Sequence, residues 1–102
     1  MKANGSNGIN KIAKPLVDAG LYNSVESVVK DLVKHLVKEK IEEYREIIED
    51  FSEKYGSLEK FSVKIKEKAT TKQEDEWLEW EASENMLIAW KSVARELDIS
   101  VA

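Results

Sequence analysis

Apolar residues recur with helical spacing along nearly the whole chain, beginning at Ile9. The first set marks one face of a short helix predicted over residues 10–19 and comprises Ile9, Ile12, Ala13, Leu16 and Val17. Asn10 can cap the start of this helix and Gly20 its end, whereas Pro15 predicts a bend or a later start. Residues 1–8 show no periodicity and are interpreted as a flexible tail.

A second, much longer helix is predicted over residues 24–55, where neither Gly nor Pro interrupts the pattern. Asn23 is the expected N-cap, with Glu26 as its capping-box partner. At 1.5 Å per residue this helix would measure about 48 Å. Because that length exceeds the diameter of a small domain, part of the helix is expected to project or to pack on a second copy.

The apolar face of this long helix changes direction halfway along. In its first half the face is formed by Val25, Val28, Val29, Leu32 and Leu36. In its second half a 3-4-3-4 spacing, typical of a coiled-coil seam, is formed by Ile41, Tyr44, Ile48, Phe51 and Tyr55. The two faces lie about a quarter turn apart. We therefore expect a homodimer whose contact residues are Val29, Leu32, Leu36, Ile41, Tyr44, Ile48 and Phe51.

Gly56 is expected to end the long helix, and Ser57 can cap another. Residues 61–66 suit either a short helix or a strand, and helix is favoured because the chain offers no partner strand. A last helix is predicted from Thr70 or Thr71 to about Leu97, with a capping-box acceptor at Gln73 or Glu74. Its main apolar stripe comprises Trp80, Leu87, Trp90, Ala94 and Leu97, with Met86 at its edge.

The predicted fold class is therefore all-α, with a long central helix flanked by shorter helices in a helical homodimer. Beyond the tail, we expect a dimerisation region over residues 9–56 and a partner-binding region over residues 57–102. The 102-residue chain has one Pro, four Gly and 35% charged residues, a composition that suits long amphipathic helices. It has no cysteine and no long apolar run or signal-peptide core, which favours a cytoplasmic protein.

Charge is distributed unevenly along the chain. Residues 1–40 hold seven Lys and Arg residues against four Asp and Glu, whereas residues 41–102 hold nine against sixteen. A basic end can meet nucleic acid and an acidic end a basic protein, although uneven solvated faces would give the same numbers.

Little in the sequence points to catalysis. His35, the one histidine, lies at the margin of an apolar face, and no phosphate-binding loop, nucleophile elbow or metal-ligand motif is present. We expect no enzyme activity, no catalytic residue, no metal and no cofactor.

Large apolar residues on a second side of the last helix, set among acids, suggest a protein-binding surface because tryptophan is enriched in interface hot spots. The candidate residues are Trp77, Leu78, Glu81, Glu84 and Ile88. The alternative is a helix buried on two sides within a homodimer.

Lys30 and Lys34 belong to a lysine stripe on the long helix that continues to Lys38. The stripe is either a solvated face or a phosphate-facing surface, in which case backbone amides near Asn23 and Ser24 would add phosphate contacts.

The segment from Ile12 to Leu36 resembles the helical part of ribbon-helix-helix regulators, in which a short helix, a turn and a capped second helix follow one another. The matching residues are Gly20, Tyr22, Asn23, Ser24, Ser27, Val28, Val29 and Leu32. The remainder, from Lys40 through Gly56 and again over residues 77–81, resembles small archaeal antitoxin-like proteins of toxin–antitoxin pairs. The resemblance implies a cytoplasmic homodimer that neutralises a toxin-like protein and binds operator DNA. Residues 1–8 lack the pattern of the DNA-reading strand, so DNA binding is expected to be weak.

These observations favour an antitoxin-like function. A helical DNA-binding regulator and a purely structural helical homo-oligomer remain as alternatives. No membrane interaction is expected.

Overall fold

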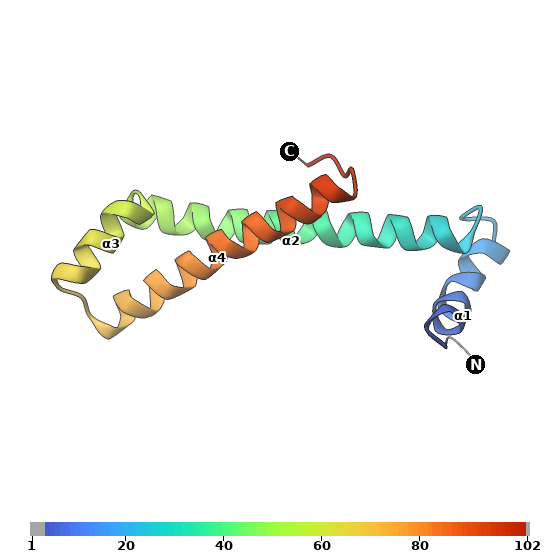
Figure 1. Ribbon diagram of the computed structural model, residues 1–102, viewed down its shortest axis with the longest axis horizontal. Helices are drawn as coiled ribbons and strands as arrows, with labels where there is room; N and C mark the ends of the chain where they lie inside the picture. Colours follow the sequence, from blue (N-terminus) through green and yellow to red (C-terminus); the bar gives the residue numbers. More distant parts are fainter. Residues whose placement is uncertain (1–3, 102) are drawn as a thin grey trace. The chain divides into compact units, whose positions relative to one another are not determined.

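The computed structural model describes residues 4–101, and within this range four α-helices follow one another (Figure 1). Helix α1 spans Asn4–Asp18, α2 Val25–Tyr55, α3 Leu58–Glu67 and α4 Thr71–Glu96. The all-helical class and the long second helix are confirmed, and residues 61–66 form helix rather than strand. None of the described helices combines the length and the apolar composition that a membrane span requires.

Helix α1 begins earlier than expected. It starts at Asn4, so residues 4–8 of the predicted tail are helical, whereas residues 1–3 lie outside the described range. Apolar periodicity could not reveal this start, because residues 4–8, Asn-Gly-Ser-Asn-Gly, include no apolar side chain that could mark a face. Pro15 lies inside α1 and does not delay its beginning.

Glycines end the first two helices as predicted. Gly20 has a φ of 80° and donates its N–H to Val17 O, while Leu21 N–H reaches Leu16 O, which completes a Schellman motif. Gly56 has a φ of 86° and donates to Ser52 O at 2.8 Å. Positive φ favours glycine because it has no Cβ.

The cap of α2 lies one residue later than expected. Ser24 Oγ, not the Asn23 side chain, accepts the N–H of Ser27 at 3.1 Å, and Ser27 Oγ accepts the N–H of Ser24 at 3.2 Å. Ser27 thus fills the position that we predicted for Glu26 in a reciprocal capping arrangement. The prediction was wrong because Asn and Ser are both good N-caps and stand side by side in the chain.

The caps of α3 and α4 agree with the sequence. Ser57 Oγ accepts the N–H of Lys60, and Thr70 and Gln73 form a complete capping box. At the far end of α4, Asp98 adopts a φ of 55° and Ile99 N–H donates to Ala94 O at 2.8 Å. This is a second Schellman motif, built on an aspartate instead of a glycine.

The chain divides into two compact units, Met1–Leu36 and Val37–Ala102, with the boundary inside α2 rather than after Gly56. Among the described residues of the first unit, only Ala13 and Val28 are buried. The boundary differs from our expectation because the second half of α2 packs with α3 and α4, so it belongs to the C-terminal unit.

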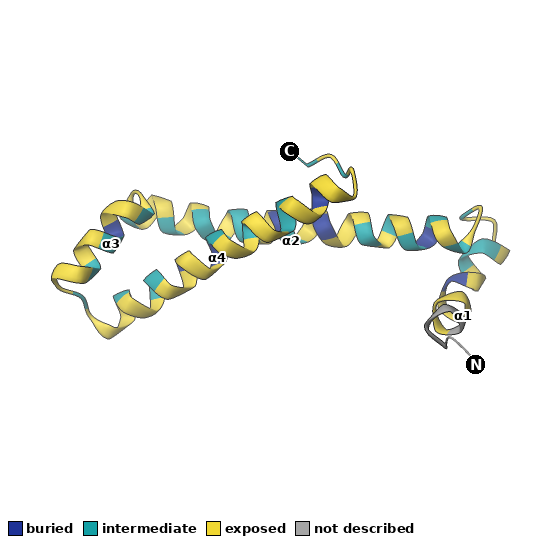
Figure 2. Ribbon diagram, viewed as in Figure 1, coloured by how far each residue is buried: buried dark blue, intermediate teal, exposed yellow. Residues whose placement is uncertain are grey.

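The core of the C-terminal unit lies where α3 and α4 meet the second half of α2. Its buried residues are Val37, Ile41, Phe61, Trp80, Ser83 and Ala94 (Figure 2). On α2 the buried and half-buried positions run through Val37, Ile41, Tyr44, Ile48, Phe51 and Tyr55, and on α4 through Glu76, Trp80, Ser83, Leu87, Trp90 and Ala94. Both series alternate steps of three and four, as in an antiparallel coiled coil. We call this contact the α2–α4 seam.

Candidate functional site

An aromatic cluster fixes the register of α4 along α2. The rings of Phe51 and Trp80 are stacked at 5.6 Å between centroids, and those of Tyr55 and Phe61 at 4.0 Å. Trp80 lies 5.8 Å from Phe61, which brings α3 into the same cluster. Large rings bury more apolar surface than any other side chains, so this cluster determines which face of α4 turns inward.

A polar contact continues the seam beyond the cluster. Tyr55 Oη donates a hydrogen bond to Glu76 Oε1 at 2.7 Å, and Lys54 Nζ forms an ion pair with Glu76 Oε2 at 2.8 Å. Lys54 first, then Tyr55, holds the pKa of Glu76 below its usual value of 4.5. The same ion pair raises the pKa of Lys54. Glu76 therefore remains a carboxylate where α4 joins α2.

Trp77, the leading candidate for partner binding, is partly engaged inside the chain. Its indole Nε1 donates to Ser62 Oγ on α3 at 2.8 Å, and its side chain is half-buried. A tryptophan whose N–H is satisfied in this way helps to hold α3 against α4. Its remaining surface alone is available to another protein.

The other candidates on α4 differ in exposure. Glu81, Leu78 and Ile88 are exposed, whereas Glu84 is half-buried. Trp77, Glu81, Glu84 and Ile88 follow one another every three or four residues and share one side of the helix. Leu78 lies on a different side.

A further apolar stripe on α4 was missed by the sequence analysis. It runs along one flank of the helix, about 110° from the seam, all its members are exposed, and it consists of Leu78, Ala82, Met86, Ala89, Val93 and Leu97. We call it the outer stripe. Leu97 was assigned to the main stripe, but the structure leaves it exposed as the C-cap residue. The spacing of its members by three or four residues was a visible signal, obscured by two alanines.

The predicted dimer contacts are divided between the two units. Leu32 and Leu36 in the first unit are 56% and 46% exposed, and Val29 is half-buried. Ile41 in the second unit is 1% exposed, and Tyr44, Ile48 and Phe51 are half-buried along the α2–α4 seam. The predicted seam is therefore present, but the chain's own α4 covers it. Ile41 has no surface left for a second copy.

The predicted phosphate contacts lie around the start of α2. Asn23, Ser24, Lys30 and Lys34 are all exposed. Lys30 and Lys34 line an open pocket of about 480 Å³ together with Tyr22 and Asp31. Lys30 pairs with Glu26 at 3.1 Å, and Tyr22 Oη donates to Asp31, which raises the pKa of Tyr22. Carboxylates thus offset part of the lysine charge, which fits weak phosphate binding at most.

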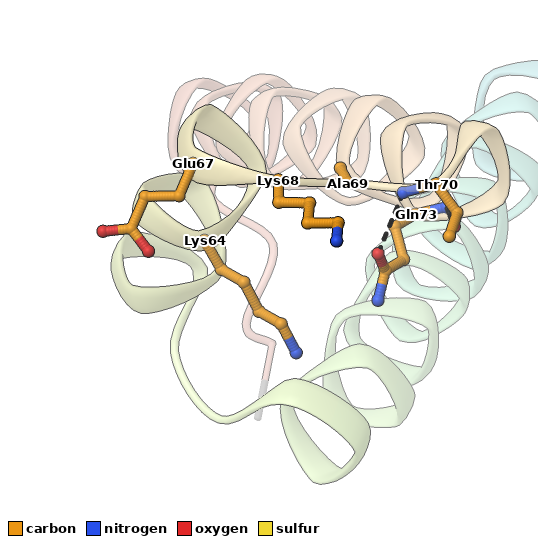
Figure 3. Close-up of a pocket in the computed structure, with 6 residues that line it drawn as sticks. All are labelled: Lys64, Glu67, Lys68, Ala69, Thr70 and Gln73. Carbon is orange, nitrogen blue, oxygen red and sulfur yellow. Dashed lines mark hydrogen bonds between the residues drawn. The ribbon is translucent and has the colours of Figure 1, made fainter.

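A second open pocket, of about 380 Å³, lies at the turn between α3 and α4 (Figure 3). The side chains of Lys64 and Lys68 extend into it, and Glu67 also contributes to its lining. Across the pocket, Gln73 Oε1 accepts the N–H of Thr70 at 3.1 Å. The pocket is formed by residues that build the turn.

His35 is exposed and lies 3.5 Å from Asp31, one turn earlier on α2. Within residues 4–101, no group of three or more His, Cys, Asp or Glu side chains is placed to hold a metal ion.

Comparison with known proteins adds no relative: no family model, no curated protein and no solved structure matches the chain.

Proposed function

We propose that the chain is an antitoxin-like protein, a homodimer that binds and neutralises a toxin-like partner protein through α4. The observation that carries this proposal is the uneven burial of α4. One face of the helix is fixed in the core by Trp80, while Leu78 and Ile88 stand exposed among acidic residues on other sides. A rigid helix that presents large apolar residues is suited to protein binding.

The homodimer is supported by the N-terminal unit. A unit of 36 residues is too small to fold on its own. Below about 40 residues, folding usually requires disulfides, metals or association with another chain. The chain has no cysteine, and Leu32, Leu36 and Ile12 remain exposed on this unit. Because each leucine is already about half buried, covering the rest of it would contribute about half of the 1.5–3 kcal/mol of full burial, on the order of 1 kcal/mol. A second copy of the same unit would supply the missing cover.

The dimer is tested by sedimentation velocity on the full chain. Replacing both Leu32 and Leu36 with Lys should give monomers, because the charges would enter the contact. Val63→Lys, at an exposed apolar position of α3, is the matched control and should remain dimeric. A dimer that survives the double change would contradict contact through this face.

Neutralisation is tested in cells. The stoichiometric partner purified with the chain should be toxic when expressed alone and harmless when expressed with the chain. Ile88→Lys combined with Leu78→Lys should abolish that rescue while leaving the helical content unchanged by circular dichroism. A partner that is harmless when alone would refute the toxin–antitoxin proposal.

Weak contact with DNA phosphates is the second candidate function. It is supported by the exposed Lys30 and Lys34 beside the capped start of α2. Binding of random-sequence duplex should fall steeply with salt, and Lys34→Gln should reduce it. Tight discrimination of the native upstream DNA would show sequence reading and favour the regulator alternative.

A further inference from the structure

The outer stripe of α4 is an unoccupied apolar surface. Its four large residues, Leu78, Met86, Val93 and Leu97, are between 39% and 55% exposed, and Ala82 and Ala89 are exposed between them. At 1.5 Å per residue the stripe is about 28 Å long. Soluble proteins seldom expose a continuous apolar surface of this length without a binding role.

The shape of the stripe suits the binding of another helix. Its members recur every three or four residues, so they form a continuous ridge on one side of α4. The two alanines leave shallow places along the ridge where a second helix can approach closely, since interaxial distance depends on the side chains at the contact.

The charge around the stripe is mainly negative. The half of α4 that carries the stripe also carries the exposed acids Asp75, Glu79 and Glu96, with the exposed Glu74 at its edge. Of the three basic residues of α4, Lys91 and Arg95 project outside this half when the helix is drawn at 100° per residue, and Lys72 lies within it but more than one turn before Leu78, where the stripe begins. An apolar ridge bordered mainly by carboxylates attracts an apolar ridge bordered by cations.

We propose that the outer stripe binds an amphipathic helix of a partner protein, a helix whose apolar face is bordered by Lys and Arg. The proposal rests on the proposed function and names the chemistry of its partner. A second copy of the chain is a poor occupant, because two stripes in contact would bring carboxylates together. Nucleic acid is repelled by the same acids.

The test uses the full chain and two synthetic helical peptides with the same leucine–alanine face, one bordered by Lys and the other by Glu. Titration calorimetry should show binding of the Lys-bordered peptide, weakening as salt is added, and at least tenfold weaker binding of the Glu-bordered one. Failure of the Lys-bordered peptide to bind at low salt would overturn the proposal.

Variants at exposed positions locate the peptide. Met86→Lys and Val93→Lys should each weaken binding at least tenfold. Val63→Lys is the matched control, because it makes the same change at an exposed apolar residue of α3, outside the stripe and outside the surface assigned to the partner. It should change binding less than twofold. Equal losses in all three variants would indicate unspecific charge attraction and overturn the proposal.

Two further results separate the outcomes. Met86→Gln, which adds no charge, should also weaken binding, and circular dichroism should show an unchanged helix. If Met86→Lys converts a dimer into monomers in sedimentation, a second copy occupies the stripe and the proposal is wrong. If instead toxin neutralisation in cells is lost only with Ile88→Lys, the antitoxin-like function is supported, but the outer stripe is not the surface that binds the toxin and the proposal is wrong.

Discussion

The two halves of α2 are parts of one helix with contrasting environments. In the first half Leu32 and Leu36 are about half exposed, although they continue the face of the buried Val28. In the second half Ile41 is fully buried, and the aromatic rings of Phe51 and Tyr55 stack with Trp80. Both halves carry the amphipathic pattern of a packed helix. Only the apolar face of the second half is covered by other helices of the same chain.

The difference shows what an apolar face specifies. The pattern fixes which side of a helix must leave water, because burial of apolar surface stabilises folding. It does not fix whether the covering residues come from the same chain or from another. In the C-terminal unit the turn at residues 68–70 reverses the chain, so that α4 packs on α2. In the N-terminal unit only the short helix α1 is available to pack on the first half of α2.

The largest effect is expected at the aromatic cluster. Trp80→Ala should lower the free energy of unfolding by about 3–5 kcal/mol, because it removes the ring that contacts both Phe51 and Phe61. Chemical denaturation followed by circular dichroism measures this change. Leu78→Ala, on the exposed side of α4, is the control and should fall within about 0.5 kcal/mol of the wild type. Similar losses for both would contradict the assigned inward face.

The next comparison sets the two halves of α2 directly against each other. Ile41→Ala should cost about 2–5 kcal/mol at every protein concentration, since its cover is intramolecular. Leu36→Ala should cost little in dilute solution and more as concentration rises and a second copy covers it. Denaturation at several concentrations measures both. A concentration-dependent loss in Ile41→Ala would place its cover in another chain.

A smaller effect is expected where α3 is held against α4. Ser62→Ala removes the acceptor of the Trp77 indole N–H and should cost about 0.5–1.5 kcal/mol. Trp77→Phe should cost a similar amount or more, and the double variant should cost less than the two together. Strict additivity in this cycle would mean that the hydrogen bond contributes nothing. The same cycle tests our sequence-based hypothesis that Trp77 belongs to a partner-binding surface and contributes little to the fold.

The smallest effect concerns Glu76, whose pKa is lowered in the folded chain by Lys54 and Tyr55. A lowered pKa stabilises the fold above the usual value of 4.5, and this contribution is lost as pH falls through the folded-state pKa. The stability difference between wild type and Glu76→Gln should therefore shrink on acidification. Because the ion pair is partly exposed, salt should weaken it. A difference that does not change from neutral to acid pH would contradict the assignment.

Much of the fold could be read from local chemistry. Gly20, Gly56 and the Thr70–Gln73 box marked helix ends that the structure confirms, because caps depend on neighbouring residues alone. The seam through Ile41 and Phe51 was also visible as a spacing. The sequence did not show that α4 covers this seam. Whether a second copy or the same chain covers it depends on the direction in which the turns send the following helices.

The candidate site was predicted less completely. Sequence periodicity separated Trp80 from Trp77, yet it could not show that Ser62 on α3 accepts the Trp77 indole N–H, a contact between helices. The outer stripe escaped notice because Met86 and Leu97 were taken with the inward face of α4. Once the inward face is known from burial, the remaining exposed apolar residues of α4 separate into that stripe and Ile88.

Hydrogen exchange at several protein concentrations tests the contrast within α2 most directly, because it reports on each half separately. Amides of residues 25–36 should become more protected as concentration rises, whereas those of residues 41–55 should exchange at rates independent of concentration. Protection of residues 25–36 that is already complete in a dilute monomer would contradict the need for a second copy. Concentration-dependent protection of residues 41–55 would contradict cover by the chain's own α4.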